Sequence, residues 1–189
     1  MPQRHNAITP RKSMIKVHDL YFEKFITHEK IQQRVQEIGE SLTKKFREKN
    51  PLFVGVLNGA FIFTADLVRA CHIPSETTFI KVASYDGMES TGTLTTQLDF
   101  QVDIQDRHII IVEDIIDSGF TLHQLLPKIQ ANNPSSITLV SLLVKPTALQ
   151  YPLPITHIGF EIPDKFVIGY GLDYREQGRN LLDIYQLKE

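Results

Sequence analysis

The sequence predicts an α/β fold in which a mostly parallel, twisted sheet is flanked by helices. Segments suited to strands alternate with helical segments of about ten residues, which is typical of βαβ units. Residues 109–112 (Ile-Ile-Ile-Val) are consecutive β-branched residues without polar alternation, as expected for a strand buried on both faces. With 189 residues, 42% of them hydrophobic, the chain can bury one substantial core, which favours a single main domain.

The first expected helix follows a polar N-terminal segment. Thr27 can cap it, and Pro51 should end it. Apolar residues recur every three or four positions, as in an amphipathic helix; they are Ile31, Val35, Ile38, Leu42 and Phe46.

The remaining elements alternate in type along the chain. Strands are expected at residues 52–57, 78–84, 109–112 and 137–144, and helices at 61–70 and 121–130. The last third, residues 152–188, has short strand-like pieces at 155–162 and 165–168 among many turn formers.

Residues 85–101 depart from this alternation because they are rich in Gly, Ser and Thr. We interpret them as a mobile flap or exposed hairpin. A simple surface excursion is the alternative, but the length of the segment and its place after a strand favour a lid that excludes water during chemistry.

Composition excludes several classes of function. Twenty basic and twenty-two acidic residues give a net charge of -2, and without a basic stripe no nucleic-acid partner is expected. No apolar stretch reaches the roughly 18 to 20 residues that span a bilayer, and the N-terminus lacks a signal-peptide core, so we expect a cytoplasmic protein with no membrane partner. The single cysteine, Cys71, excludes an intramolecular disulfide and favours a small buried thiol over a nucleophile.

Carboxylates cluster after the apolar segment 109–112. Glu113, Asp114 and Asp117 follow it closely, and ligands of open α/β sheets collect beyond the carboxyl ends of the strands. We therefore expect these side chains to project where a substrate binds. An ordinary junction in which Asp117 or Ser118 merely caps the next helix is the alternative.

A turn suited to phosphate comes next. Ser118 and Gly119 can aim backbone N–H groups at an anion, and Thr121 adds a hydroxyl at the start of a helix. Because Glu113 and Asp114 would repel phosphate, they must face another part of the ligand, and the vicinal hydroxyls of a sugar fit. The turn is not a P-loop, since no Gly-Lys-Ser/Thr follows it.

Residues 112–121 (Val-Glu-Asp-Ile-Ile-Asp-Ser-Gly-Phe-Thr) closely resemble the phosphoribosyl pyrophosphate (PRPP) loop of type I phosphoribosyltransferases, in particular the hypoxanthine-guanine branch. Most of the chain shares this resemblance. Residues 56–61 resemble the first active-site loop of the family, Ser84-Tyr85 its mobile-loop dipeptide, 143–145 its purine-side lysine and 160–174 its base-binding segment, with Arg179 at the expected distance.

The resemblance implies the type I phosphoribosyltransferase fold in one domain. Its core would cover about residues 37–160, its mobile loop about 85–101, and its small hood about 1–36 and 161–189. The implied reaction belongs to purine salvage. It transfers the 5-phosphoribosyl group from PRPP to N9 of hypoxanthine or guanine with Mg2+, yielding IMP or GMP and pyrophosphate. The family's habit further implies a homodimer or homotetramer.

Site roles follow from the same resemblance. Glu113 and Asp114 would bind the ribose hydroxyls and serve the metal, and Asp117 would assist proton transfer at N7 of the purine. The 5-phosphate side would be bound by Asp117, Ser118, Gly119, Phe120 and Thr121. Pyrophosphate would be bound by Leu57, Asn58, Gly59, Ser84, Tyr85 and Arg179.

The purine would be bound by Lys145, Lys165, Phe166, Val167 and Asp173. Lys145 would donate to the 6-oxo group, although a lysine at the end of a strand could also snorkel to solvent. Phe166 would stack on the base and Val167 would read its edge through the backbone; apart from the resemblance, both suit a core. Asp173 would also serve a Mg2+ ion.

Two residues depart from the family pattern. Asn58 stands where lysine is common, often after a cis peptide, and Phe120 stands where lysine or another polar residue is common. Two rival interpretations are a regulatory protein of this fold that binds RNA and a nucleotide-binding module without catalysis. Within the enzymes, the alternative is a relative that prefers xanthine or hypoxanthine.

Overall fold

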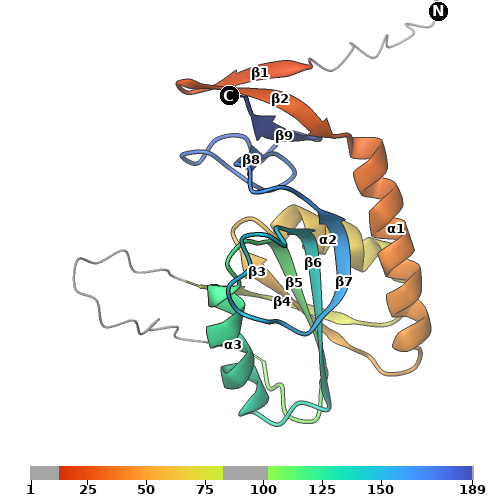
Figure 1. Cartoon of the computed structure of the whole chain (residues 1–189). Helices are drawn as coiled ribbons and strands as arrows, with labels where there is room; N and C mark the ends of the chain where they lie inside the picture. Colours follow the sequence, from red (N-terminus) through yellow and green to blue (C-terminus); the bar gives the residue numbers. More distant parts are fainter. Residues whose placement is uncertain (1–12, 83–101, 189) are drawn as a thin grey trace, which may run out of the picture.

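The computed structural model describes residues 13–82 and 102–188 of the chain (Figure 1). Its core is a five-stranded parallel sheet with the strand order β4-β3-β5-β6-β7. The strands are β3 (Leu52–Leu57), β4 (Glu76–Lys81), β5 (His108–Ile116), β6 (Ser136–Val144) and β7 (Ile155–Glu161). The expected lid at 85–101, together with Ser84 and Tyr85, lies outside the described residues.

Helices cover both faces of this sheet. Helices α1 (His28–Lys45) and α2 (Phe61–Ala70) pack on one face, and α3 (Phe120–Gln130) packs on the other. Neighbouring residues of the central strand point to opposite sides, so Ile110 joins the α1 and α2 core while Ile109 joins the α3 core. The predicted α/β fold with a mostly parallel sheet is confirmed.

Helix α1 begins where the sequence predicts. Thr27 is its N-cap, and the Thr27 hydroxyl oxygen accepts a hydrogen bond from the Lys30 backbone N–H at 3.4 Å. The predicted end at Pro51 is wrong, because the helix stops at Lys45. Glu48 and Asn50 take positive φ angles of 64° and 41°, which leave the helical region.

The strand predicted at 109–112 is longer in the structure. It runs through the carboxylates to Ile116 because its ladder with β6 continues, pairing Glu113 with Ser141 and Ile116 with Val144. Glu113 and Asp114 therefore lie in the last part of β5 rather than beyond its end, which corrects the prediction. Strand β4 begins at Glu76, two residues before the predicted start, while β3 and α2 have the predicted bounds.

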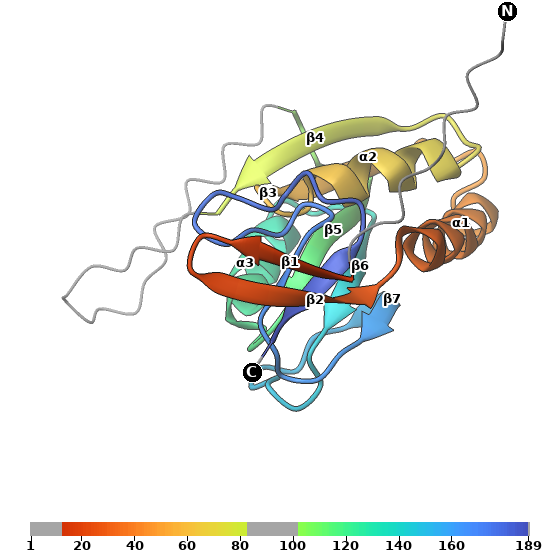
Figure 2. The same cartoon turned by 90° about the horizontal axis from the view of Figure 1, so that it is seen from above.

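A second, antiparallel sheet lies over the end of the core sheet at which β3 and β5 finish (Figures 1 and 2). It has the order β1-β2-β9-β8, formed by β1 (Met14–Val17), β2 (Leu20–Ile26), β9 (Ile184–Leu187) and β8 (Val167–Ile168). The hood implied by the resemblance thus joins N- and C-terminal strands, although β1, β2 and β9 were not predicted. The predicted boundary between hood and core at residue 36 falls inside α1. This boundary stays a prediction.

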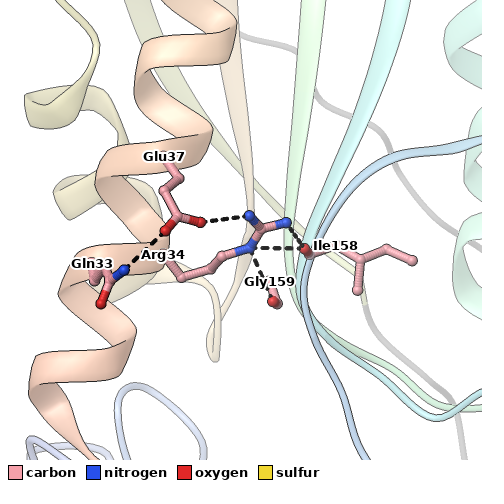
Figure 3. Close-up of polar contacts among 5 residues, drawn as sticks. All are labelled: Gln33, Arg34, Glu37, Ile158 and Gly159. Carbon is pink, nitrogen blue, oxygen red and sulfur yellow. Dashed lines mark hydrogen bonds and ion pairs between the residues drawn. The ribbon is translucent and has the colours of Figure 1, made fainter.

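Arg34 of α1 covers the outer strand β7 (Figure 3). Its guanidinium donates to the carbonyl oxygens of Ile158 at 2.7 Å and Gly159 at 3.1 Å, and an ion pair with Glu37 at 2.7 Å fixes its direction. The Arg34 side chain thereby covers the edge strand β7, which limits pairing with another strand.

None of the helices in the described ranges combines the length and hydrophobicity that a membrane crossing needs.

Candidate active site

The candidate site lies where three core strands end beneath the hood. Because β3, β5 and β6 are parallel, their carboxyl ends meet at one edge of the sheet. Asp117 follows β5, Lys145 follows β6, and the loop beginning at Asn58 follows β3. A backbone hydrogen bond of 2.9 Å from Lys145 N–H to the Ile116 carbonyl oxygen holds the ends of β6 and β5 together.

The turn between β5 and α3 has the geometry expected of an anion cradle. Gly119 takes a positive φ of 82° directly before α3, which begins at Phe120, one residue earlier than predicted. Residues 113 and 115–122 line a hollow at this helix N-terminus, where backbone N–H groups attract anions. The Ser118 hydroxyl accepts from the Phe120 N–H at 3.3 Å, so Ser118 both shapes the turn and lines the hollow.

Glu113 and Asp114 form a carboxyl pair at the end of β5. Burial raises the pKa of Glu113 well above its usual range, and the charge of Asp114 and the hydrogen bond to it raise this pKa further. Burial also raises the pKa of Asp114, against the lowering effect of its hydrogen bonds to Glu113 and to the Ile115 N–H at 2.8 Å. Within the described residues Glu113 Oε2 is buried and has no hydrogen-bond partner. Such a pair can accept hydroxyl donors or a cation.

Lys145 is buried between two carboxylates. Its ammonium nitrogen lies 2.7 Å from Asp117 Oδ2 and 3.0 Å from Asp164 Oδ1. The alternative that Lys145 snorkels to solvent is wrong, because the residue is only 7% exposed. The alternative that Asp117 or Ser118 caps α3 holds only for Ser118, whose hydroxyl accepts from the first N–H of the helix, whereas the Asp117 carboxylate pairs with Lys145. Asp164 was not predicted, since an acid in a turn looks like an ordinary turn former.

The loop after β3 packs tightly against its neighbours. The Leu57-Asn58 peptide bond is cis. A Cβ atom on Gly59 would collide with the Asp114 carboxylate, and one on Gly171 would collide with the Gly59 carbonyl oxygen. The structure thus brings the predicted pyrophosphate loop, the end of β5 and the hood into direct contact, while Asn58 is exposed.

The hood places the predicted purine residues in different environments. Phe166 is 44% exposed, so its assignment to a core is wrong, whereas Val167 is buried. The exposed Phe166 ring packs beside Phe22 and Tyr174, with centroids 6.2 and 5.8 Å away. Lys165, the next residue towards the N-terminus, is half-buried.

Asp173 and Arg179 lie together in the hood. The Arg179 guanidinium is 2.8 Å from Asp173 Oδ1 and donates to the Gly171 carbonyl oxygen at 2.9 Å. In this structure the predicted metal-side acid and the predicted pyrophosphate cation therefore neutralise one another. Of the remaining predicted residues, Leu57, Phe120 and Thr121 are half-buried at the same edge of the sheet.

The predicted free thiol is confirmed. Cys71 is buried and unbridged, and burial raises its pKa to about 11. It caps the C-terminal end of α2, away from the site, and a thiol that holds its proton is a poor nucleophile.

Comparison with known proteins decides the family. A model described as the phosphoribosyl transferase domain matches residues 24–175. The chain belongs to the phosphoribosyltransferase family. Its relatives include the hypoxanthine-guanine phosphoribosyltransferase of Bacillus subtilis, 42% identical over 164 residues that cover 86% of this chain and 91% of the relative. The hypoxanthine-guanine-xanthine phosphoribosyltransferase of Tritrichomonas foetus is 39% identical over 160 residues, covering 84% and 87% of the two chains.

Solved structures agree with this assignment. The crystal structure of a hypoxanthine phosphoribosyltransferase from Staphylococcus aureus matches with a TM-score of 0.83 and 38% identity, covering 88% of this phosphoribosyltransferase and 91% of that chain. The fold predicted from the resemblance is therefore that of the family.

Proposed function

We propose that this phosphoribosyltransferase makes IMP or GMP in purine salvage, by transferring the 5-phosphoribosyl group of PRPP to N9 of hypoxanthine or guanine and releasing pyrophosphate. The family assignment supports PRPP as the donor of the phosphoribosyl group. The names of the relatives, all of which act on 6-oxopurines, support the base half of this reaction.

The observation that carries the proposal is the adjacency of Lys145 and Asp117. On a 6-oxopurine, O6 and N7 are neighbouring acceptors on one edge of the base. An ammonium and a carboxylate 2.7 Å apart match that edge, the first donating to O6 and the second holding a proton at N7. The 6-amino group of adenine would instead present a donor to the ammonium, so Lys145 selects against it.

The ribose phosphate is assigned to the end of β5 and the start of α3. The 5-phosphate would accept hydrogen bonds from N–H groups of residues 118–121, at the positive end of the helix. The Glu113 and Asp114 pair would accept from the 2- and 3-hydroxyls. Glu113 Oε2, buried without a partner, is an acceptor that a ribose hydroxyl would satisfy.

The residues also fit Mg2+ shared with the substrate. Among the described residues no group of three or more His, Cys, Asp or Glu side chains could bind a metal alone, but Mg2+ is commonly bound by one or two carboxylates plus substrate phosphates and water. Glu113 and Asp114, or Asp173 on the pyrophosphate side, would supply those carboxylates. Bound there, Mg2+ would neutralise charge on the departing pyrophosphate.

The protein's own groups then act on the transfer itself. The bond from ribose C1 to pyrophosphate breaks as N9 attacks, and the ribose takes on oxocarbenium character. Nearby carboxylates favour that positive charge. Asp117 assists proton transfer at N7, and the Arg179 guanidinium fork is suited to pyrophosphate once it parts from Asp173.

The test is a spectrophotometric assay of the full chain with PRPP and Mg2+, offering hypoxanthine, guanine, xanthine, adenine and uracil separately. We expect turnover of hypoxanthine or guanine and none of adenine or uracil. Omission of Mg2+ should abolish it. Turnover of uracil or adenine instead of a 6-oxopurine would contradict the proposal. Turnover of xanthine measures whether the site accepts an oxo group at C2 of the base.

We also propose that the enzyme is a homodimer or homotetramer, in keeping with the habit of the family. Light scattering coupled to size-exclusion chromatography measures this directly. A monomer at micromolar concentration would overturn this part alone.

A further inference from the structure

Three segments that are distant in sequence bring their charges to one point. Asp117 follows β5, Lys145 follows β6, and Asp164 lies in the turn after β7. The Lys145 side chain is 8% exposed, whereas those of Asp117 and Asp164 are 55% and 65% exposed. The lysine is therefore enclosed, and each carboxylate approaches it from the solvent side.

The lysine is kept charged by this arrangement. Burial alone would lower the pKa of Lys145, but the hydrogen bonds and charges of Asp117 and Asp164 together outweigh burial and raise it. An ammonium has three N–H donors. Two are used by the carboxylates at 2.7 and 3.0 Å, which leaves the third for a carbonyl oxygen of the base.

Asp117 would take part in two different interactions. In this structure its carboxylate pairs with Lys145, while the proposed reaction requires the same carboxylate at N7. If Asp117 were the sole partner, its departure would leave a buried ammonium without a counter-charge, which is costly. Asp164 is the second partner already in place.

We propose that Asp164 is a positioning residue for the purine site. It holds the Lys145 ammonium in place when Asp117 turns to the base, so that one lysine proton stays aimed at the 6-oxo group. Asp164 touches neither ribose nor phosphate in this scheme, and it acts only through Lys145. This inference rests on the proposed function.

The test compares Asp164→Ala, Asp164→Asn and the control Glu40→Gln. Glu40 is an exposed acid of α1, outside the segment 160–174. We expect Asp164→Ala to raise the KM for hypoxanthine and guanine about tenfold, as for a lost charge-assisted hydrogen bond, with the KM for PRPP unchanged. Asp164→Asn keeps an acceptor oxygen and should recover part of the loss, and Glu40→Gln should behave as wild type.

A double-mutant cycle separates positioning from general structural damage. In a Lys145→Met background, adding Asp164→Ala should have no further effect on the KM for purine, because the group through which Asp164 acts is gone. A full additional loss in that background would overturn the inference, as would an Asp164→Ala variant that matches wild type. A wild-type enzyme that forms no nucleotide would overturn the proposed function as well, so the two failures are distinguishable.

Discussion

Gly171 packs directly against the carbonyl oxygen of Gly59, so the hood meets the loop after β3 without a side chain between them. Gly59 in turn lies against the carboxylate of Asp114. The distance between the purine side of the site and the ribose side is therefore set by two glycine backbones, and any side chain at either position must push the two halves apart.

Gly171→Ala tests this contact, and the chain offers a matched control. Gly171 and Gly178 have nearly the same φ, 106° and 101°, so alanine at either costs about 1–3 kcal/mol of backbone strain. Only Gly171 faces a backbone oxygen, since a Cβ atom on Gly178 would meet the Ile168 side chain at ordinary contact distances.

We expect Gly171→Ala to lose most kcat/KM for both substrates, and Gly178→Ala to lose stability with much smaller effects on catalysis. Steady-state kinetics and urea unfolding of both variants measure this. Equal kinetic losses in the two variants would mean that strain, rather than the approach to Gly59, explains the effect.

Asp117→Asn tests the assignment at N7. The amide can still accept from Lys145 and preserves the shape of the turn, but it cannot take up a proton. We expect kcat to fall by about 10²–10⁴-fold, the usual contribution of a general acid or base, while PRPP affinity, measured by calorimetry, is retained. Full activity in the variant would overturn the role of Asp117 in proton transfer.

Lys145→Ala tests selection of the 6-oxo group. It removes the donor to O6 and also leaves Asp117 and Asp164 without their shared cation. The KM for purine should rise at least tenfold, as expected when a charged donor is lost, and the KM for PRPP should change far less. Lys44→Ala, at an exposed position in the last turn of α1, is the control. Equal increases for both substrates would argue against a purine-specific role.

Much of the core could be predicted because its signals are local. Strand β3 and helix α2 have the predicted bounds, since each is an apolar run ended by turn or helix-capping residues. The hood strands β1, β2 and β9 were missed because they are short. Strands β1 and β2 pair locally through a two-residue turn, but β2 pairs with β9 across the length of the chain, as in the contact of Phe22 with Leu187. Nothing within β2 or β9 indicates this long-range pairing.

The candidate site shows the same contrast between local sequence signals and tertiary contacts. The resemblance supplied the positions of Asp117 and Lys145, but their ion pair forms only because β5 and β6 end side by side. The extension of β5 through Glu113 was missed because acids usually end a strand, whereas here the ladder with β6 outweighs that tendency. Asp164 and the pairing of Asp173 with Arg179 are tertiary contacts that no spacing reveals.

Glu113→Gln should stabilise the fold at neutral pH while weakening catalysis. Burial, and then Asp114, raise the pKa of Glu113 above its ordinary value of 4.5, so the stability contributed by this carboxyl is present below that pH and is lost as pH rises towards the folded-state pKa. Glutamine does not titrate. Its advantage in free energy of unfolding should therefore grow between pH 5 and 8 to on the order of 1 kcal/mol, measured by urea titration beside Glu40→Gln. A constant difference would contradict a strained carboxyl pair.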